Sequence, residues 1–156
     1  MLPTRQLELA NPTSGSRKLI LVVDDSRMVA QLLKHLVEAE GFNAIIARDG
    51  LDGLETARRE RPDLIVSDLH MPRMHGLDLV RALRADSETR DIPILILSGN
   101  EDPIDRAQAL AAGADGYGVK GDSRRFVDQI KALLTRSGSI SPDSRERRPP
   151  GASEWR

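Results

Sequence analysis

Short apolar runs alternate regularly with amphipathic stretches of helical length, and this alternation most constrains what the chain can fold into. Three of the runs are nearly continuous in Ile, Leu and Val, which is typical of strands that are buried on both faces of a parallel sheet. The second and fifth runs are weaker, as edge strands would be. In chain order the five runs are Leu19–Val23, Ala44–Ala47, Leu64–Ser67, Ile92–Leu97 and Gly116–Val119.

The stretch after each run places apolar residues at the three- and four-residue spacing of a helix that packs by one face. In the first stretch Ser26 can cap the helix and Gly41 can end it, and Arg61-Pro62 stops the second. The apolar face of the first helix is predicted to comprise Val29, Leu32, Leu33, Leu36 and Val37. The five predicted helices span Ser26–Glu40, Leu51–Glu60, Gly76–Arg84, Pro103–Ala112 and Ser123–Thr135.

Strands that alternate with helices of this length imply right-handed crossover connections onto a parallel sheet. We therefore predict an α/β fold of the doubly wound, flavodoxin-like (βα)5 type, with five parallel strands in the order 2-1-3-4-5. The 156 residues suggest one domain, which we place at 18–136. Residues 1–17 are interpreted as a flexible N-terminal arm, and the polar, Pro-rich residues 137–156 as a disordered C-terminal tail.

The composition is that of an ordinary soluble globular protein, with 39% hydrophobic and 30% charged residues. No apolar run approaches the roughly 20 residues that span a bilayer, and the first residues lack the apolar core of a signal peptide. The absence of cysteine excludes disulfides and thiolate chemistry. A formal net charge of −1 gives no field that would attract nucleic acid or a membrane surface. We expect a cytoplasmic protein with neither of those partners.

Three carboxylates are expected to meet at one edge of the predicted sheet. Ligands of open α/β sheets bind beyond the carboxyl ends of the strands, where the strand order reverses, which here lies between the first and third strands. The first strand ends in Asp24-Asp25 and the third ends in Asp68. Carboxylates that are packed together repel one another, and Mg²⁺ prefers such oxygen ligands together with retained water. The pattern therefore predicts a magnesium site.

A hydroxyl and an ammonium should reach the same edge, because the fourth strand ends in Ser98 and the fifth ends near Lys120. A carboxylate nucleophile, a metal, a hydroxyl donor and a cation are together the equipment for accepting a phosphoryl group. Lys120 and the metal would neutralise the charge that develops on the phosphoryl oxygens.

Four segments, each at the end of a predicted strand, carry a family resemblance. They are Leu-Val-Val-Asp-Asp at 21–25, Ser-Asp-Leu-His-Met-Pro-Arg-Met-His-Gly at 67–76, Ile-Leu-Ile-Leu-Ser-Gly at 94–99 and Gly-Ala-Asp-Gly-Tyr-Gly-Val-Lys at 113–120. Each segment alone is a weak signal, whereas all four in this order are highly specific. The chain resembles the response-regulator receiver domain of two-component signalling, of the chemotaxis-regulator type, over about residues 18 to 136.

The resemblance implies roles for individual residues. Asp68 matches the phosphoacceptor, and Asp24 and Asp25 match the acidic pair that binds Mg²⁺ together with it, with Mn²⁺ as a substitute. The backbone carbonyl of His70 would supply another metal ligand.

Three further residues match the parts that sense the phosphoryl group. Lys120 matches the lysine that contacts it, Ser98 matches the switch hydroxyl, and Tyr117 matches the switch aromatic. The readout is expected on the face formed by the helix at 103–112, the strand at 116–119 and the helix at 123–135.

The resemblance implies a signalling switch rather than an enzyme, one that catalyses only its own phosphotransfer and slow autodephosphorylation. The donor would be a histidine kinase or a histidine phosphotransfer protein, which would dock near Met28, a residue expected to be exposed beside the pocket. No output domain follows the last predicted helix, so we interpret the chain as a stand-alone receiver that acts by binding another, unknown protein.

Departures from the family pattern leave alternatives open. Gly121 stands where the family usually has a proline after a cis bond, so we expect a trans bond or a strained cis bond, and a looser loop. His70 and His75 stand at positions that affect the lifetime of the phosphoryl group. The main alternative is a degenerate receiver that serves as a phosphorylation-independent docking module. A phosphatase with an aspartyl-phosphate intermediate ranks last, because it usually needs a carboxylate at the position of His70.

Overall fold

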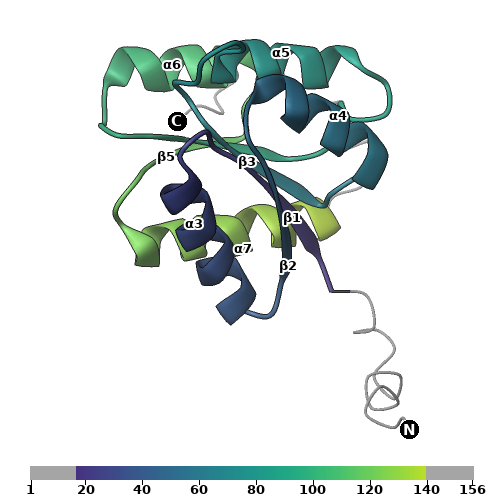
Figure 1. The fold of residues 1–156 in the computed structure, drawn as a ribbon, viewed down its shortest axis with the longest axis vertical. Coiled ribbons are helices and arrows are strands. Elements are labelled where there is room, and N and C mark those ends of the chain that lie inside the picture. Colours follow the sequence, from purple (N-terminus) through teal and green to yellow (C-terminus); the bar gives the residue numbers. More distant parts are fainter. Residues whose placement is uncertain (1–16, 140–156) are drawn as a thin grey trace, which may run out of the picture.

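The structure, a computed structural model, describes residues 17–139. Its centre is a parallel sheet of five strands in the order β2-β1-β3-β4-β5, which confirms the predicted doubly wound α/β fold (Figure 1). The two weaker apolar runs form the two edge strands, as their composition predicts. The strands are β1 Leu19–Val23, β2 Asn43–Ala47, β3 Leu64–Asp68, β4 Ile94–Ser98 and β5 Gly116–Val119.

Helices cover both faces of the sheet, with α3 and α7 on one face and α4, α5 and α6 on the other (Figure 1). Each predicted helix is present, and α7 continues beyond Thr135, where the apolar pattern ends. The helices are α3 Arg27–Ala39, α4 Gly50–Glu60, α5 Gly76–Ala85, α6 Pro103–Ala112 and α7 Ser123–Ser139.

The ends of the first two helices follow local sequence signals. Ser26 Oγ accepts a hydrogen bond from Val29 N at 3.2 Å and so caps α3, as predicted. Gly41, just past the end of α3, has a φ of 94°, which glycine adopts without strain. Arg61 ends α4 in the left-handed region with a φ of 47°, immediately before Pro62. These signals fix where the chain leaves each helix and turns back to the sheet.

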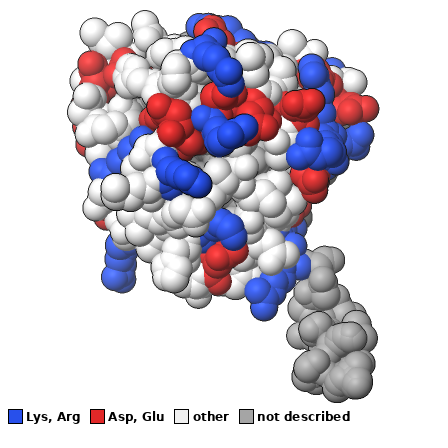
Figure 2. Space-filling model, in the orientation of Figure 1, with Lys and Arg blue, Asp and Glu red and all other residues white. Residues whose placement is uncertain are grey.

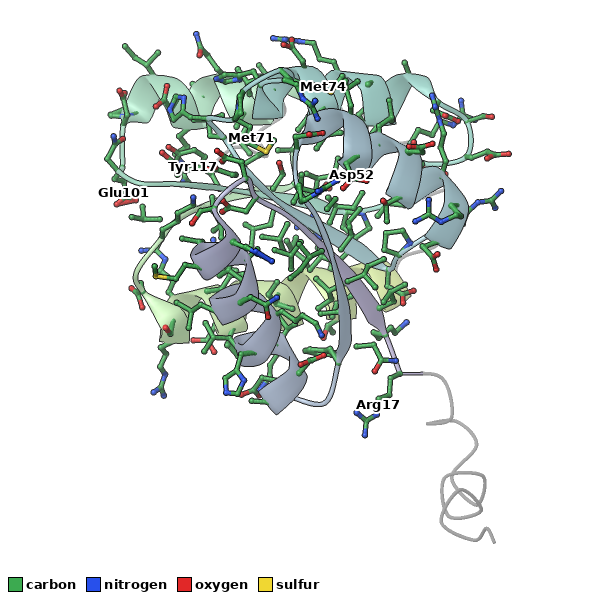
Figure 3. The ribbon with its side chains drawn as sticks, in the orientation of Figure 1. Arg17, Asp52, Met71, Met74, Glu101 and Tyr117 are labelled. Atoms are coloured by element: carbon green, nitrogen blue, oxygen red, sulfur yellow. The ribbon has the colours of Figure 1, made fainter. Side chains whose placement is uncertain are left out.

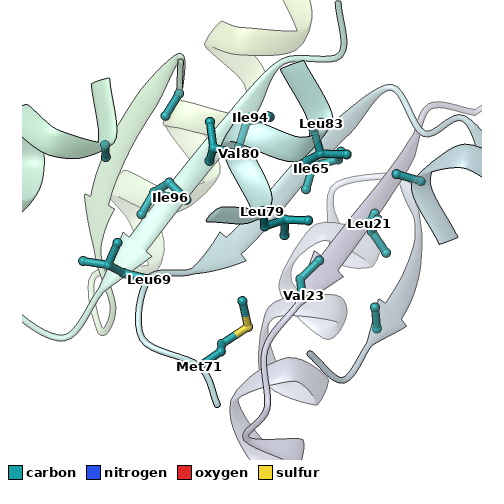
Figure 4. Packing of buried hydrophobic residues seen from close by; sticks show 14 of the residues in the cluster. Leu21, Val23, Ile65, Leu69, Met71, Leu79, Val80, Leu83, Ile94 and Ile96 are labelled. Atoms are coloured by element: carbon teal, nitrogen blue, oxygen red, sulfur yellow. The ribbon is translucent and has the colours of Figure 1, made fainter. Parts of the chain in front are cut away.

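The strands bury side chains on both faces, in two separate cores. Ile20 and Val22 point toward α3 and α7, whereas Leu21 and Val23 point toward the other three helices. Figure 4 shows the latter core, in which Leu79 of α5 packs over the sheet. Burial on both faces explains why the central strands are nearly continuous apolar runs.

Leu32 departs from the predicted apolar face of α3. Its side chain is 53% exposed, whereas Ala30, Leu33 and Val37 are buried. Successive residues of a helix are turned by about 100°, so a face centred on these three residues leaves Leu32 at its solvent margin. The prediction for Leu32 was wrong because the buried face of α3 is centred on Ala30, Leu33 and Val37, away from Leu32.

The predicted N-terminal arm and C-terminal tail fall almost entirely outside the described residues, so the limits of the domain stay a prediction. Within residues 17–139, no helix combines the length and the apolar character needed to cross a membrane.

Candidate functional site

The strand register brings the acidic residues to one edge of the sheet. Val23 of β1 pairs with Ser67 of β3, so the residues that follow them, Asp24 and Asp68, are neighbours at the strand ends. β4 and β5 continue the sheet beside β3 and end at the same edge. The predicted meeting of side chains from four strands is therefore present in the structure.

Asp24, Asp25 and Asp68 form a compact cluster, in which each carboxylate offers an oxygen within 4.8 Å of the others. Asp24 and Asp68 are buried, and Asp25 is exposed. Asp24 Oδ1 accepts a hydrogen bond from Ser26 N at 2.9 Å, which fixes the carboxylate. Its other oxygen, Oδ2, is buried and accepts no hydrogen bond from the described residues. Such an atom suits a cation as its partner.

Lys120 bridges two members of this cluster. Its Nζ lies 3.0 Å from Asp68 Oδ1 and 3.0 Å from Asp24 Oδ2, and it forms an ion pair with each carboxylate. Burial lowers the pKa of the Lys120 ammonium, but the carboxylates of Asp68 and Asp24 outweigh it and hold that pKa above its usual value.

Burial and three charged neighbours together set the pKa of the Asp68 carboxyl. Burial raises the pKa of its carboxyl, Lys120 opposes that rise, and the charges of Asp24 and Asp25 add to it, so that the pKa lies above the usual value. One ammonium among three carboxylates leaves the cluster with excess negative charge. A divalent cation that prefers oxygen ligands would offset that charge, and the donor set fits Mg²⁺.

Ser98 and Tyr117 are linked through the loop that follows β4. Ser98 is fully buried, and its Oγ accepts a hydrogen bond from Asn100 N at 3.4 Å. Tyr117 of β5, labelled in Figure 3, is 2% exposed, and its hydroxyl donates to the Asn100 carbonyl at 3.1 Å. The aromatic ring therefore lies inward in this structure, and Asn100 connects it to the hydroxyl at the end of β4.

The residues that depart from the family pattern have defined places. All peptide bonds of the described residues are trans, including the one before Gly121. Gly121 has a φ of 102°, which proline could not adopt because its ring fixes φ near about −65°. His70 is exposed, with Nε2 3.9 Å from Asp105 Oδ2. His75 caps α5, because its Nδ1 accepts a hydrogen bond from Leu77 N at 3.2 Å.

The surface around these elements is of mixed charge. Figure 2 shows acidic and basic side chains interleaved over the upper part of the face that it presents. Met28, at the start of α3, is 77% exposed, as expected. An apolar side chain of this size in contact with solvent is a candidate contact for a partner protein.

Two contacts were not predicted from the sequence. Arg73, in the loop after β3, forms an ion pair with Asp49, the buried N-cap of α4. Arg84 of α5 binds Asp115 at 2.8 Å, just before β5. A helix-capping signal marks Asp49, but no local pattern pairs it with a residue 24 positions later.

Curated proteins with similar sequences are regulators. The chain is 38% identical over 131 residues to the probable transcriptional regulatory protein TcrX of Mycobacterium tuberculosis, a match that covers 83% of this chain and 55% of that protein. It is 38% identical over 128 residues to the alkaline phosphatase synthesis transcriptional regulatory protein PhoP of Bacillus subtilis, over 81% of this chain and 52% of that protein. The chain thus spans about half the length of these relatives.

Solved structures with the same fold include signalling domains. The chemotaxis protein CheY4 of Vibrio cholerae superposes with a TM-score of 0.72 at 31% identity, over 76% of this chain and 99% of that one. The receiver domain of a signal transduction histidine kinase from Syntrophus aciditrophicus also gives 0.72, at 33% identity, over 80% of this chain and 96% of that one.

Residues 20–131 match the family model of the response regulator receiver domain. The matched region contains β2 to β5, all of β1 except Leu19, the acidic cluster and Lys120. This family supplies the signalling switch of two-component systems rather than a conventional enzyme. The chain therefore belongs to the response regulator receiver domain family.

Proposed function

We propose that this receiver domain accepts a phosphoryl group on Asp68 from a phosphohistidine donor, with Mg²⁺ bound beside it, and that the aspartyl phosphate changes how the domain binds another protein. The observation that carries the proposal is the position of Lys120 Nζ, 3.0 Å from both Asp68 and Asp24, within a cluster of three carboxylates. This arrangement pairs a carboxylate nucleophile with a cation that can receive the oxygens of a phosphoryl group.

Asp24, Asp25 and Asp68 would hold the Mg²⁺, or Mn²⁺ in its place, with the backbone carbonyl of His70 as a further ligand. The close cluster of three carboxylates, which has a single ammonium beside it, supports this assignment. When bound, the cation offsets the charge of the phosphoryl oxygens and of the carboxylates around them.

In the proposed transfer, a carboxylate oxygen of Asp68 attacks the phosphorus of the phosphohistidine. The new P–O bond forms as the P–N bond breaks, and the electron pair of that bond goes to the imidazole nitrogen of the donor. In this proposal Lys120 would contact the oxygens of the phosphoryl group as it arrives. In the slow hydrolysis that follows, water attacks the phosphorus and the Asp68 carboxylate leaves, which releases inorganic phosphate.

Acetyl phosphate tests this proposal without a partner protein. With Mg²⁺, the parent protein should gain the mass of one phosphoryl group, and with a chelator in place of Mg²⁺ it should gain little. Beryllofluoride, which mimics an acyl phosphate, should bind under the same Mg²⁺-dependent conditions. Failure of both would contradict the proposal and favour a docking module that works without phosphorylation.

Asp25→Ala is expected to weaken Mg²⁺ binding by more than about tenfold, since even residues that only orient metal ligands have effects of that size. Labelling by acetyl phosphate should fail, while the free energy of unfolding holds or rises, because the charge of Asp25 opposes ionisation of the buried Asp68. Calorimetry measures the affinity, and Asp78→Ala, at an exposed position on α5, is the control. An Asp25→Ala protein that binds Mg²⁺ as tightly as the parent would refute this metal site.

The donor is proposed to be a histidine kinase or histidine phosphotransfer protein that contacts the exposed Met28 beside the site. The output is proposed to be a protein that binds the face formed by α6, β5 and α7. The hydrogen bonds that link Ser98 and Tyr117 through Asn100 support a connection between the site and this face.

Ser98→Ala is expected to leave phosphorylation by acetyl phosphate intact and to uncouple it from that output face. The hydroxyl would donate a charge-assisted hydrogen bond to a phosphoryl oxygen on Asp68. Such a bond shifts the equilibrium between two conformations of the domain by a few kcal/mol at most. NMR shift maps with and without beryllofluoride measure the coupling. In the parent, shifts should extend to Ile104–Gln108 and Tyr117; in Ser98→Ala they should stay near the pocket. Parent changes confined to the pocket would rule out this output face.

A further inference from the structure

The loop after β3 contains a strained turn centred on Arg73. Met74 N donates a hydrogen bond to the carbonyl of Pro72 at 2.7 Å, which closes a three-residue turn. Arg73, at the centre of this turn, has a φ of 67°. A γ-turn with positive φ is rare, and a residue other than glycine remains in it only where its surroundings hold it there.

Two contacts hold the turn against the start of α4. The Arg73 guanidinium is paired with Asp49 Oδ2, in a carboxylate side chain that is only 10% exposed. Asp49 Oδ1 accepts a hydrogen bond from Asp52 N at 2.9 Å, as the N-cap of α4. Met74 (Figure 3) lies so close to Gly50 that a Cβ added to this glycine would be 2.6 Å from Met74 Cβ. One carboxylate therefore fixes both the start of α4 and the loop that packs on it.

The same loop is joined tightly to the backbone of Asp68. Leu69 N donates to the Leu97 carbonyl at 2.9 Å, and Gly76 N donates to the Leu69 carbonyl at 2.8 Å, so the loop closes on the end of β3. A Cβ added to Gly76 would lie 2.5 Å from the carbonyl oxygen of Asp68. With so little free space, a displacement of the loop has to move the backbone that carries Asp68 and His70.

We propose that Arg73 is a positioning residue of the phosphorylation site. By pairing with Asp49, it holds residues 69–75 so that the Asp68 carboxylate and the His70 carbonyl are in place for Mg²⁺. Arg73 does not touch the reacting atoms and acts only through the backbone of the loop. This inference rests on the proposed function, because it assigns a role toward the cation of that site.

Calorimetric titration with Mg²⁺ alone tests the proposal on the full chain. In Arg73→Ala the Kd for Mg²⁺ should rise about tenfold, as is typical when a residue that orients metal ligands is removed. Asp49→Asn keeps an oxygen to cap α4 but removes the charge, and it should raise the Kd in the same way.

Arg73→Lys keeps a positive charge and should recover part of the affinity for Mg²⁺. Arg73→Gly, which relieves the backbone strain but lacks the guanidinium, should behave like Arg73→Ala. Arg73 and Asp49 are proposed to act through one contact. The double variant Arg73→Ala with Asp49→Asn should therefore have a Kd for Mg²⁺ no higher than that of the single variant that binds Mg²⁺ less tightly.

Two controls separate positioning from general destabilisation. Arg81→Ala removes an exposed arginine with an ion pair to Asp78 elsewhere in the molecule, and it should leave the Kd unchanged. Leu134→Ala, in the other core, should lower the stability in urea without changing the Kd of the folded protein.

The outcomes are distinct for the two proposals. If Arg73→Ala binds Mg²⁺ as the parent does, or if Leu134→Ala weakens binding equally, the positioning role is wrong and the proposed function stands. If the parent itself binds no Mg²⁺, the proposed function fails and this inference fails with it.

Discussion

Asp68→Asn is expected to abolish labelling by acetyl phosphate and to leave the domain folded. The amide has nearly the shape of the carboxylate but lacks the charged oxygen that would attack phosphorus. Intact mass measures the labelling, and urea denaturation measures the stability. Labelling should fall to the background seen without Mg²⁺.

The stability of this variant has a predictable sign. The pKa of Asp68 is raised in the folded domain, chiefly by burial, so the folded state binds the proton more tightly than the unfolded chain does. Ionisation of Asp68 therefore costs stability as the pH rises through that pKa, and the neutral amide avoids this cost at pH 7. Lys120 keeps its contact with Asp24. The free energy of unfolding should hold or rise.

Asp78→Asn serves as the matched control, because it makes the same chemical change at an exposed position on α5. It should label as the parent does. If Asp68→Asn were labelled in full, the phosphoryl group would be on another residue and the assignment of the acceptor would be wrong.

Arg84→Ala is expected to lower the free energy of unfolding by about 3 kcal/mol, which is typical of removing one partner of a buried ion pair. Arg84 Nη2 binds Asp115 Oδ2 at 2.8 Å, and the Asp115 side chain is 3% exposed. The same guanidinium donates to the carbonyls of Gly113, Arg90 and Ile92 at 3.0, 2.9 and 2.7 Å. The alanine variant leaves these acceptors without that donor and removes the Arg84 charge beside the Asp115 carboxylate.

Two contacts keep the loss near the lower end of the range for buried pairs. Asp115 Oδ2 also accepts from Ile94 N at 2.9 Å, and Arg136 lies 3.7 Å from Asp115 Oδ1. Urea denaturation at pH 7 gives the free energy. Arg81→Ala, which removes one side of an exposed pair, should cost about 1 kcal/mol or less. A cost for Arg84→Ala as small as that of the control would contradict a structural role. Mg²⁺ affinity should not change, because this network lies away from the acidic cluster.

The sequence predicted the fold and the acidic site because both depend on short patterns and on the topology. Strand ends meet at one edge in a parallel sheet, so Asp24, Asp25, Asp68 and Lys120 could be placed together from their positions alone. The structure brings these four side chains into contact distance. Their chemical roles stay predictions that the substitutions above test.

Other features depend on how closely packed elements approach one another, which no local pattern encodes. The side chain of Arg73 meets Asp49 only because Gly50 lets the loop after β3 come within contact of α4. Leu32 has the helical spacing of a core residue, yet the side of α3 that is buried contains Ala30, Leu33 and Val37 instead. The inward position of the Tyr117 ring likewise depends on Asn100, in a loop whose path the sequence did not predict.

Lys120 follows β5, a four-residue edge strand that is paired on one side only. Local openings cost less free energy than unfolding of the whole domain, and an opening of β5 would withdraw the Lys120 ammonium from the acidic cluster. During synthesis on the ribosome, Asp24, Asp25 and Asp68 also emerge well before β5 does. A chain still being translated would therefore lack the Lys120 ammonium, which contacts the phosphoryl oxygens in the proposed function, until β5 has joined the sheet.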